Sequence, residues 1–137
     1  MRIPLKIIGT GDDRTLKKIA GPNIEFLGFV SDKEKAQYLS RAQALIHPQE
    51  EDFGITPIEA MASGRPVIAY KAGGALETVV DGLTGRFFNE QNWESLAETV
   101  VKFNSRAFDS KKIQKHALKF SNERFKKEIL DFVNSHV

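Results

Sequence analysis

The stretch Glu51-Asp52-Phe53-Gly54-Ile55-Thr56-Pro57-Ile58-Glu59 continues through Gly64-Arg65-Pro66 into Val67-Ile68-Ala69-Tyr70, and it decides the predicted fold. Thr56 is a good N-cap, and Pro57 suits the first helical position because its missing N–H would have no helical partner. Gly64 and Pro66 end this helix, and residues 67–70 read as a buried strand. Exposed N–H groups at a helix start attract anions. With Glu51 and Glu59 beside them, they suggest a ligand with phosphate and hydroxyl groups, such as a nucleotide sugar.

Strand and helix signals alternate five times along the chain. Strands are predicted at residues 4–8, 24–27, 44–47, 67–70 and 86–88, and helices follow each of them. Ser31 and Glu34 form a capping box at the start of the second helix. Such alternation predicts parallel strands with right-handed helical crossovers, hence an α/β domain with helices on both faces of its sheet. Two more helices, near residues 110–120 and 121–133, follow. We therefore expect an α/β part at residues 1–104 and helices at residues 105–137 that pack on the same domain.

Composition narrows the class of protein. The 137 residues suffice for one domain, and 41% hydrophobic with 28% charged residues is ordinary for a globular protein. A net charge of +2 gives no argument for nucleic acid, and the absence of cysteine excludes disulfides and thiolate metal sites. No apolar run reaches the ~20 residues of a membrane span, so a cytoplasmic location is the default expectation. The basic tail from Ser105 reads either as a solvated face or as a patch that faces a membrane surface.

Four segments follow the carboxyl ends of the predicted strands, where open α/β sheets bind their ligands. They are residues 9–11, 30–35, 47–56 and 71–74. Gly9-Thr10-Gly11 is either a tight strand-to-helix turn or a turn that a ligand approaches closely. It is not a dinucleotide fingerprint, because Arg14 stands where the third glycine would be.

Each acidic residue of the central stretch has a structural alternative. Glu59 could reach back to the Thr56 amide as a capping box, or it could accept two vicinal hydroxyls of a ribose. Glu51 could belong to a solvated cluster with Glu50 and Asp52, or it could face a ligand. A metal site is weakly supported because no histidine joins these acids in a ligand motif. Of the three histidines, only His47 lies near a strand's carboxyl end.

With these residues assembled, the chain resembles the donor-binding half of a retaining GT-B glycosyltransferase of the large family numbered four. The resemblance covers about residues 4–104 and rests on five motifs in the family's order. They are Ile7 to Gly11, Ile24 to Asp32, Glu51 to Pro66, Gly73 to Val79, and Asp81 to Gly85. The fold that it implies is a Rossmann-like parallel sheet, the C-terminal half of a GT-B fold.

The resemblance also implies roles for individual residues. Glu51 would face the donor sugar as the catalytic carboxylate, and Glu59 would hydrogen-bond the ribose. The remaining donor-sugar and diphosphate contacts would come from Gly9, Gly11, Phe53, Gly54, Ile55 and Thr56. Val30, Asp32 and Lys35 would hold the base. A carboxylate at Asp32 matches the two adjacent N–H donors of guanine, which favours GDP-mannose, although Asp32 could instead simply help to start its helix.

The implied reaction transfers mannose, with retention, to a glycan or a lipid-linked acceptor, without a metal or other cofactor. In the family, an Arg and a Lys upstream hold the diphosphate, and another domain binds the acceptor. The chain would be N-terminally truncated relative to full-length members, so we expect these residues alone to be inactive. A lipid acceptor would imply weak, peripheral membrane association. The alternative function is a non-catalytic module that binds a nucleotide or a sugar.

Overall fold

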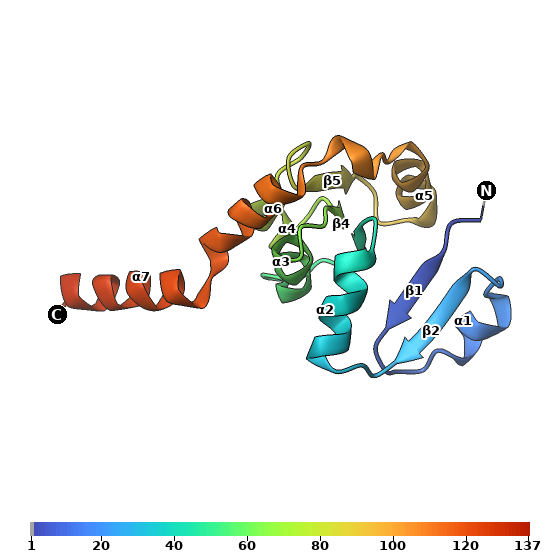
Figure 1. Cartoon of the computed structure of the whole chain (residues 1–137), viewed down its shortest axis with the longest axis horizontal. Coiled ribbons are helices and arrows are strands. Elements are labelled where there is room, and N and C mark those ends of the chain that lie inside the picture. Colours follow the sequence, from blue (N-terminus) through green and yellow to red (C-terminus); the bar gives the residue numbers. More distant parts are fainter. Residues whose placement is uncertain (1) are drawn as a thin grey trace. The chain divides into compact units, whose positions relative to one another are not determined.

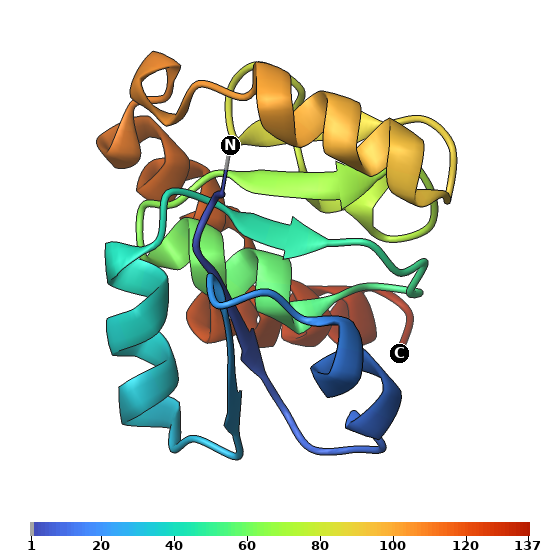
Figure 2. The same ribbon diagram turned by 90° about the vertical axis from the view of Figure 1, so that its right-hand side faces the viewer.

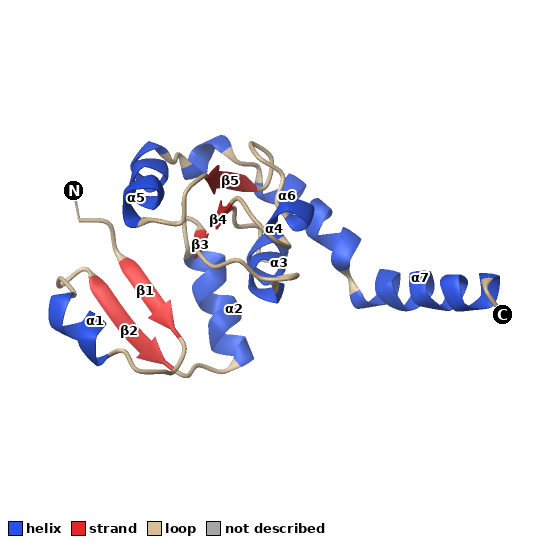
Figure 3. Ribbon diagram, turned by 180° about the vertical axis from the view of Figure 1, so that it is seen from behind, coloured by secondary structure: helices blue, strands red, loops and turns tan. Residues whose placement is uncertain are grey.

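The computed structural model describes residues 2–137 and divides the chain into two compact units (Figure 1). The first unit ends at Tyr38 and the second begins at Leu39, inside helix α2 (Asp32–Arg41). Each unit has its own sheet, and the strands in both sheets pair in parallel, as predicted (Figure 3). The proposed division of the chain at residue 104 stays a prediction.

The first unit consists of β1 (Leu5–Ile8), α1 (Arg14–Ile19), β2 (Ile24–Gly28) and the first part of α2. The two strands pair with Leu5 opposite Ile24. The predicted capping box is confirmed, because the Ser31 N–H donates to Glu34 Oε2 at 2.8 Å and the Glu34 N–H donates to Ser31 Oγ at 3.2 Å. This local exchange satisfies N–H groups at the start of α2 and places the helix directly after β2.

The second unit carries a sheet of strand order β3-β4-β5. Its elements up to the last strand are β3 (Leu45–His47), α3 (Ile55–Ala62), β4 (Val67–Tyr70), α4 (Ala75–Thr78) and β5 (Gly85–Phe88). Then come α5 (Trp93–Lys102), η1 (Ser105–Ala107), α6 (Ser110–Ala117), η2 (Leu118–Phe120) and α7 (Asn122–Ser135). Figure 2 shows α5 alongside β5, which it contacts.

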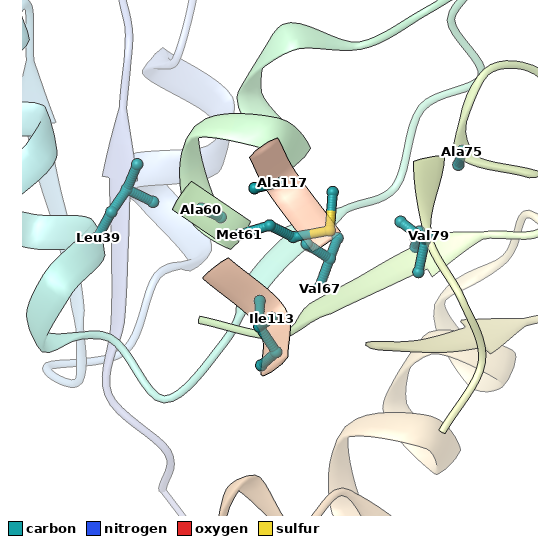
Figure 4. Packing of buried hydrophobic residues seen from close by; sticks show 9 residues of the cluster. Leu39, Ala60, Met61, Val67, Ala75, Val79, Ile113 and Ala117 are labelled. Carbon is teal, nitrogen blue, oxygen red and sulfur yellow. The ribbon is translucent and has the colours of Figure 1, made fainter. Parts of the chain in front are cut away.

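The core of the second unit lies around β4 and α3. Met61, Val67, Ala69 and Ile113 are fully buried, and the last of these comes from α6, which packs against α3 (Figure 4). A central parallel strand is covered on both faces, so its continuous apolar run fits this position. By contrast, every residue of α7 is exposed, including its large apolar side chains.

The predicted start of α3 is wrong. The helix begins at Ile55 with Gly54 as its N-cap, so Thr56 and Pro57 are its second and third residues. Gly54 has a φ of +82°, a conformation that glycine adopts without steric cost, and its geometry sets the start of the helix. The short 3-10 turn η1 between α5 and α6 was also not predicted. The remaining elements agree with their predicted ranges to within a few residues.

Candidate functional site

The loop after β3 packs against the turn after β4. The Gly74 N–H donates to the Glu51 carbonyl oxygen at 2.7 Å. A Cβ at Gly73 would lie 2.4 Å from that same oxygen, and a Cβ at Gly74 would lie 2.5 Å from Phe53 Cα. Real Cβ atoms do not approach so closely, so only two glycines let the turn support the acidic loop. The two segments thus meet at the carboxyl edge of the sheet, as predicted.

The side chains of Glu51 and His47 both lie close to Gly54. A Cβ built on Gly54 would stand 3.4 Å from Glu51 Oε2 and 3.5 Å from His47 Nε2. The other carboxylate oxygen, Oε1, accepts a hydrogen bond from Gln49 Nε2 at 2.9 Å. The Glu51 side chain is therefore held over the start of α3 while it remains exposed to solvent. A methyl group at Gly54 would touch both groups only at ordinary van der Waals distance, so it is the φ of +82° that favours glycine there.

His47 is buried, with 3% of its surface exposed. Burial lowers the pKa of its imidazole below the ordinary 6.5, and the charge of Glu51 opposes this shift. The ring is therefore mainly neutral at neutral pH, so one ring nitrogen can donate a hydrogen bond while the other accepts one. The sequence alone indicates no role for His47. Its place at the carboxyl end of a strand was the only available signal.

The first turn of α3 has no side-chain cap. The N-cap, Gly54, has no side chain that could accept a hydrogen bond from the helix N–H groups, and Pro57 has no N–H. In the described part of the chain, no hydrogen bond is formed by the N–H groups of Ile55 and Thr56, and both residues are exposed. Uncapped N–H groups at the positive end of the helix dipole favour an anion there.

Two residues of this segment, Glu59 and Phe53, have different surroundings from those expected. Glu59 is the fifth residue of α3 and is half-buried, so the capping box with Thr56 is wrong, because that box needs an N-cap three residues earlier. Phe53 is 45% exposed, and its ring packs edge-on against Phe120 at 6.1 Å between centroids. The ligand roles of both residues stay predictions.

The remaining predicted residues belong to the first unit. The Gly9 N–H donates to the Gly28 carbonyl oxygen at 2.8 Å, which joins the carboxyl ends of β1 and β2. A Cβ on Gly9 or Gly11 would meet nothing within 4 Å, so the turn has an open face. Val30 is half-buried in the loop between β2 and α2. The structure thus brings the predicted residues together within each unit.

Asp32 and Lys35 lie one helical turn apart at the start of α2. The Asp32 side chain is fully exposed, and its Oδ1 lies 3.5 Å from Lys35 Nζ. Because Ser31 and Glu34 already cap the helix, Asp32 is not needed as a cap. It can still interact favourably with the helix dipole.

Comparisons with known proteins agree on one family. The family model "Glycosyl transferases group 1" matches residues 2–120. An uncharacterised 41.2 kDa protein of the cps region of Klebsiella pneumoniae is 31% identical over 96% of this chain and 36% of its own length. The alpha-1,3/1,6-mannosyltransferase ALG2 of Dictyostelium discoideum is 39% identical over 73% of this chain and 24% of its own length.

Two solved structures share the fold. The HepE protein of Anabaena, solved with UDP, has a TM-score of 0.76 at 23% identity, covering 97% of this chain and 41% of its own. Sucrose-phosphate synthase of Thermosynechococcus elongatus has a TM-score of 0.84 at 23% identity, covering 95% of this chain and 37% of its own. The chain thus spans about a quarter to two fifths of these proteins. No helix in the described residues is long and apolar enough to cross a bilayer. The chain belongs to the group 1 glycosyltransferases and has the fold of the C-terminal half of GT-B enzymes.

Proposed function

We propose that this chain binds the nucleotide-sugar donor of a retaining glycosyltransferase. The observation that carries the proposal is the arrangement around Gly54. An exposed carboxylate, Glu51, is held over the uncapped start of α3 by two glycines that accept no side chain. A nucleotide sugar has both groups that such an arrangement recognises, a diphosphate for the amides and hydroxyls for the carboxylate.

Different residues of this chain would contact different parts of the donor. The N–H groups of Ile55 and Thr56 would donate to the diphosphate, where the helix dipole contributes up to ~2 kcal/mol in a partly buried site. Glu51 would accept hydrogen bonds from the sugar hydroxyls and oppose the positive charge that develops at the anomeric carbon. Glu59 would accept the ribose hydroxyls. Gly9 and Gly11 would let the donor approach the backbone.

For the nucleoside, we propose guanosine, and for the sugar, mannose. Asp32 would accept the two adjacent N–H groups of guanine, and Lys35 stands beside that carboxylate. The name of ALG2 as a mannosyltransferase supports mannose. The uridine alternative is supported by HepE, which was solved with UDP-glucose. Val30 would contact the base in either case.

The complete reaction would transfer the sugar with retention to a glycan or a lipid-linked acceptor. The departing diphosphate would take the proton of the attacking hydroxyl, and no metal or other cofactor is part of the proposal. Fixed donors matter because removing one donor to a developing charge costs about 3–4 kcal/mol. The two relatives named above are about three times as long as this chain, and we propose that the acceptor site requires such additional sequence. A non-catalytic nucleotide-sugar-binding module is the second candidate.

Calorimetric titration of the 137-residue chain with GDP, UDP and ADP tests the donor. We expect GDP to bind most tightly, and Asp32→Ala to remove that preference. Asp131→Ala, which removes an exposed carboxylate from α7, serves as the matched control and should leave it unchanged. Equal affinities for the three nucleotides would contradict guanosine. No measurable binding of any nucleotide would contradict the donor-binding proposal itself.

The two candidate functions differ in turnover. Sugar transfer, or slow hydrolysis of the donor, by this chain joined to the additional sequence of a group 1 relative would support the enzyme. Nucleotide binding without any turnover of donor in that fusion would support the module.

A further inference from the structure

Three arginines line a hollow of about 280 Å³ in the second unit. They come from separate segments: Arg41 ends α2, Arg65 lies between α3 and β4, and Arg106 lies in η1. We name this feature the arginine hollow. Its lining also includes the hydroxyl-bearing residues Ser105 and Ser110.

The arginine hollow lies at the amino edge of the sheet. Two of its three segments immediately precede β3 and β4, whose starts are joined by the hydrogen bond from the Leu45 N–H to the Pro66 carbonyl oxygen at 3.0 Å. In Figure 2 both strands start on the left, on the side where the orange η1 segment lies. Glu51 and Gly54 lie beyond the opposite end of β3, whose three residues span about 10 Å at ~3.3 Å per residue. The hollow is therefore separate from the donor site.

One guanidinium is fixed by the protein itself. Arg65 is half-buried and donates through Nε to the Ser40 carbonyl oxygen at 2.9 Å, and its Nη2 donates to the same oxygen. These bonds also satisfy a carbonyl at the end of α2, which explains part of the role of Arg65. They leave further N–H donors of the fork unused, and they hold the fork in one orientation.

The other two guanidiniums are exposed and have no protein partner. Within residues 2–137, neither Arg41 nor Arg106 forms an ion pair or a side-chain hydrogen bond. Other surface arginines do have acidic partners, as in Arg86 with Asp81 and Arg124 with Glu128. Three like charges around one hollow repel one another, so an anion between them would be stabilised.

The wall of the hollow is tightly built. Gly64 has a φ of +74°, and a Cβ there would lie 3.1 Å from Ser110 Cβ, so the loop before β4 packs closely against the start of α6. Asp109 is the nearest acid in sequence, and its carboxylate is occupied as the α6 N-cap by the N–H groups of Lys111 and Lys112. Arg65 and Ser110 therefore have a defined spacing.

We propose that the arginine hollow binds a phosphoryl group, either a phosphate monoester or a diphosphate. Arginine forks match the tetrahedral oxygens of phosphate in pairs, and the serine hydroxyls add neutral donors. The volume is just below that of pockets that enclose drug-sized molecules, which suits a small anionic group. The group belongs either to a soluble phosphate compound or to the headgroup of an anionic lipid. This proposal does not depend on the donor-binding function.

Titration of the full 137-residue chain with inorganic pyrophosphate, followed by calorimetry and amide NMR, tests the proposal. We expect shifts in the amides of residues 64, 65 and 105–110. The double variant R41Q/R106Q should weaken binding at least tenfold. Arg65 is retained because it supports the end of α2. The control R14Q/R124Q removes the same charge elsewhere and should bind as the original chain does.

Binding to vesicles distinguishes the two possible sources of the phosphoryl group. Binding to phosphatidylcholine vesicles that contain phosphatidate, but not to pure phosphatidylcholine vesicles, would identify a lipid headgroup if R41Q/R106Q abolishes it. Binding of pyrophosphate alone would identify a soluble phosphate compound. Shifts confined to residues 54–56, undiminished binding by R41Q/R106Q, or no binding of either probe would each overturn the proposal.

Discussion

The substitution Gly74→Ala tests whether the turn after β4 positions the Glu51 loop. Gly74 has a φ of −62°, which alanine adopts freely, so the effect of the new methyl group is steric. That methyl group would lie 2.5 Å from Asp52 O, Phe53 Cα and Phe53 O, whereas ordinary contacts begin at 3.4 Å. The loop must therefore move by about 0.9 Å. The hydrogen bond from the Gly74 N–H to the Glu51 carbonyl oxygen would also be strained.

The expected cost follows from these contacts. Overpacking of this kind lowers the free energy of unfolding by about 1–3 kcal/mol. Misplacing a catalytic or substrate-binding group by 1 Å can lower the reaction rate by about 10²-fold. We therefore expect at least tenfold weaker donor binding, measured by calorimetry well below the unfolding midpoint. Amide hydrogen exchange in residues 50–54 should also become faster.

Val67→Ala is the matched control for this experiment. Val67 is fully buried in β4, so its truncation destabilises the core by roughly 2 kcal/mol without adding an atom near the loop. It should leave donor affinity and exchange in residues 50–54 nearly unchanged. If Gly74→Ala binds donor and exchanges its amides as the original chain does, the turn does not position Glu51.

Three further predictions concern stability. Met61→Ala should lower the free energy of unfolding by about 2–5 kcal/mol, measured by denaturant titration, because Met61 is fully buried between α3 and its neighbours; a loss below about 1 kcal/mol would contradict the packing. The lowered pKa of His47 means that the unfolded chain binds more protons, so stability should fall as the pH drops below about 6.5; His47→Gln should reduce this dependence, and an unchanged pH profile would count against it. Ending the chain after Ser121 should change the free energy of unfolding by less than about 1 kcal/mol, because every residue of α7 is exposed; a large drop in the thermal midpoint would show that α7 supports the second unit.

The sequence predicted those features correctly that depend on residues close together along the chain. The capping box of Ser31 and Glu34 was predicted because both partners lie within one turn, and both of its hydrogen bonds form. Asn92 and Ser121, which are residue types favoured at N-caps, accept hydrogen bonds from the Ser95 and Arg124 N–H groups and cap α5 and α7. The parallel pairing of the strands followed from their alternation with helices.

The start of α3 shows where local reasoning failed. Thr56 and Pro57 are better residues for a helix start than Gly54 by intrinsic preference. Gly54 is the N-cap nevertheless, with a positive φ and with the side chains of Glu51 and His47 close by. The loop before it is held from a distance by Gly73 and Gly74, and no pattern within residues 51–59 reveals that contact.

By itself, the sequence determined the α/β class and the order of the elements, because periodicity, caps and turns are local properties. Only the tertiary structure decided how Glu51 is held, that Glu59 is no capping residue, and that His47 is buried beside Gly54. It alone gathered Arg41, Arg65 and Arg106 around one hollow. Contacts between residues this far apart depend on how the strands and helices pack, and the order of residues along the chain does not record that packing.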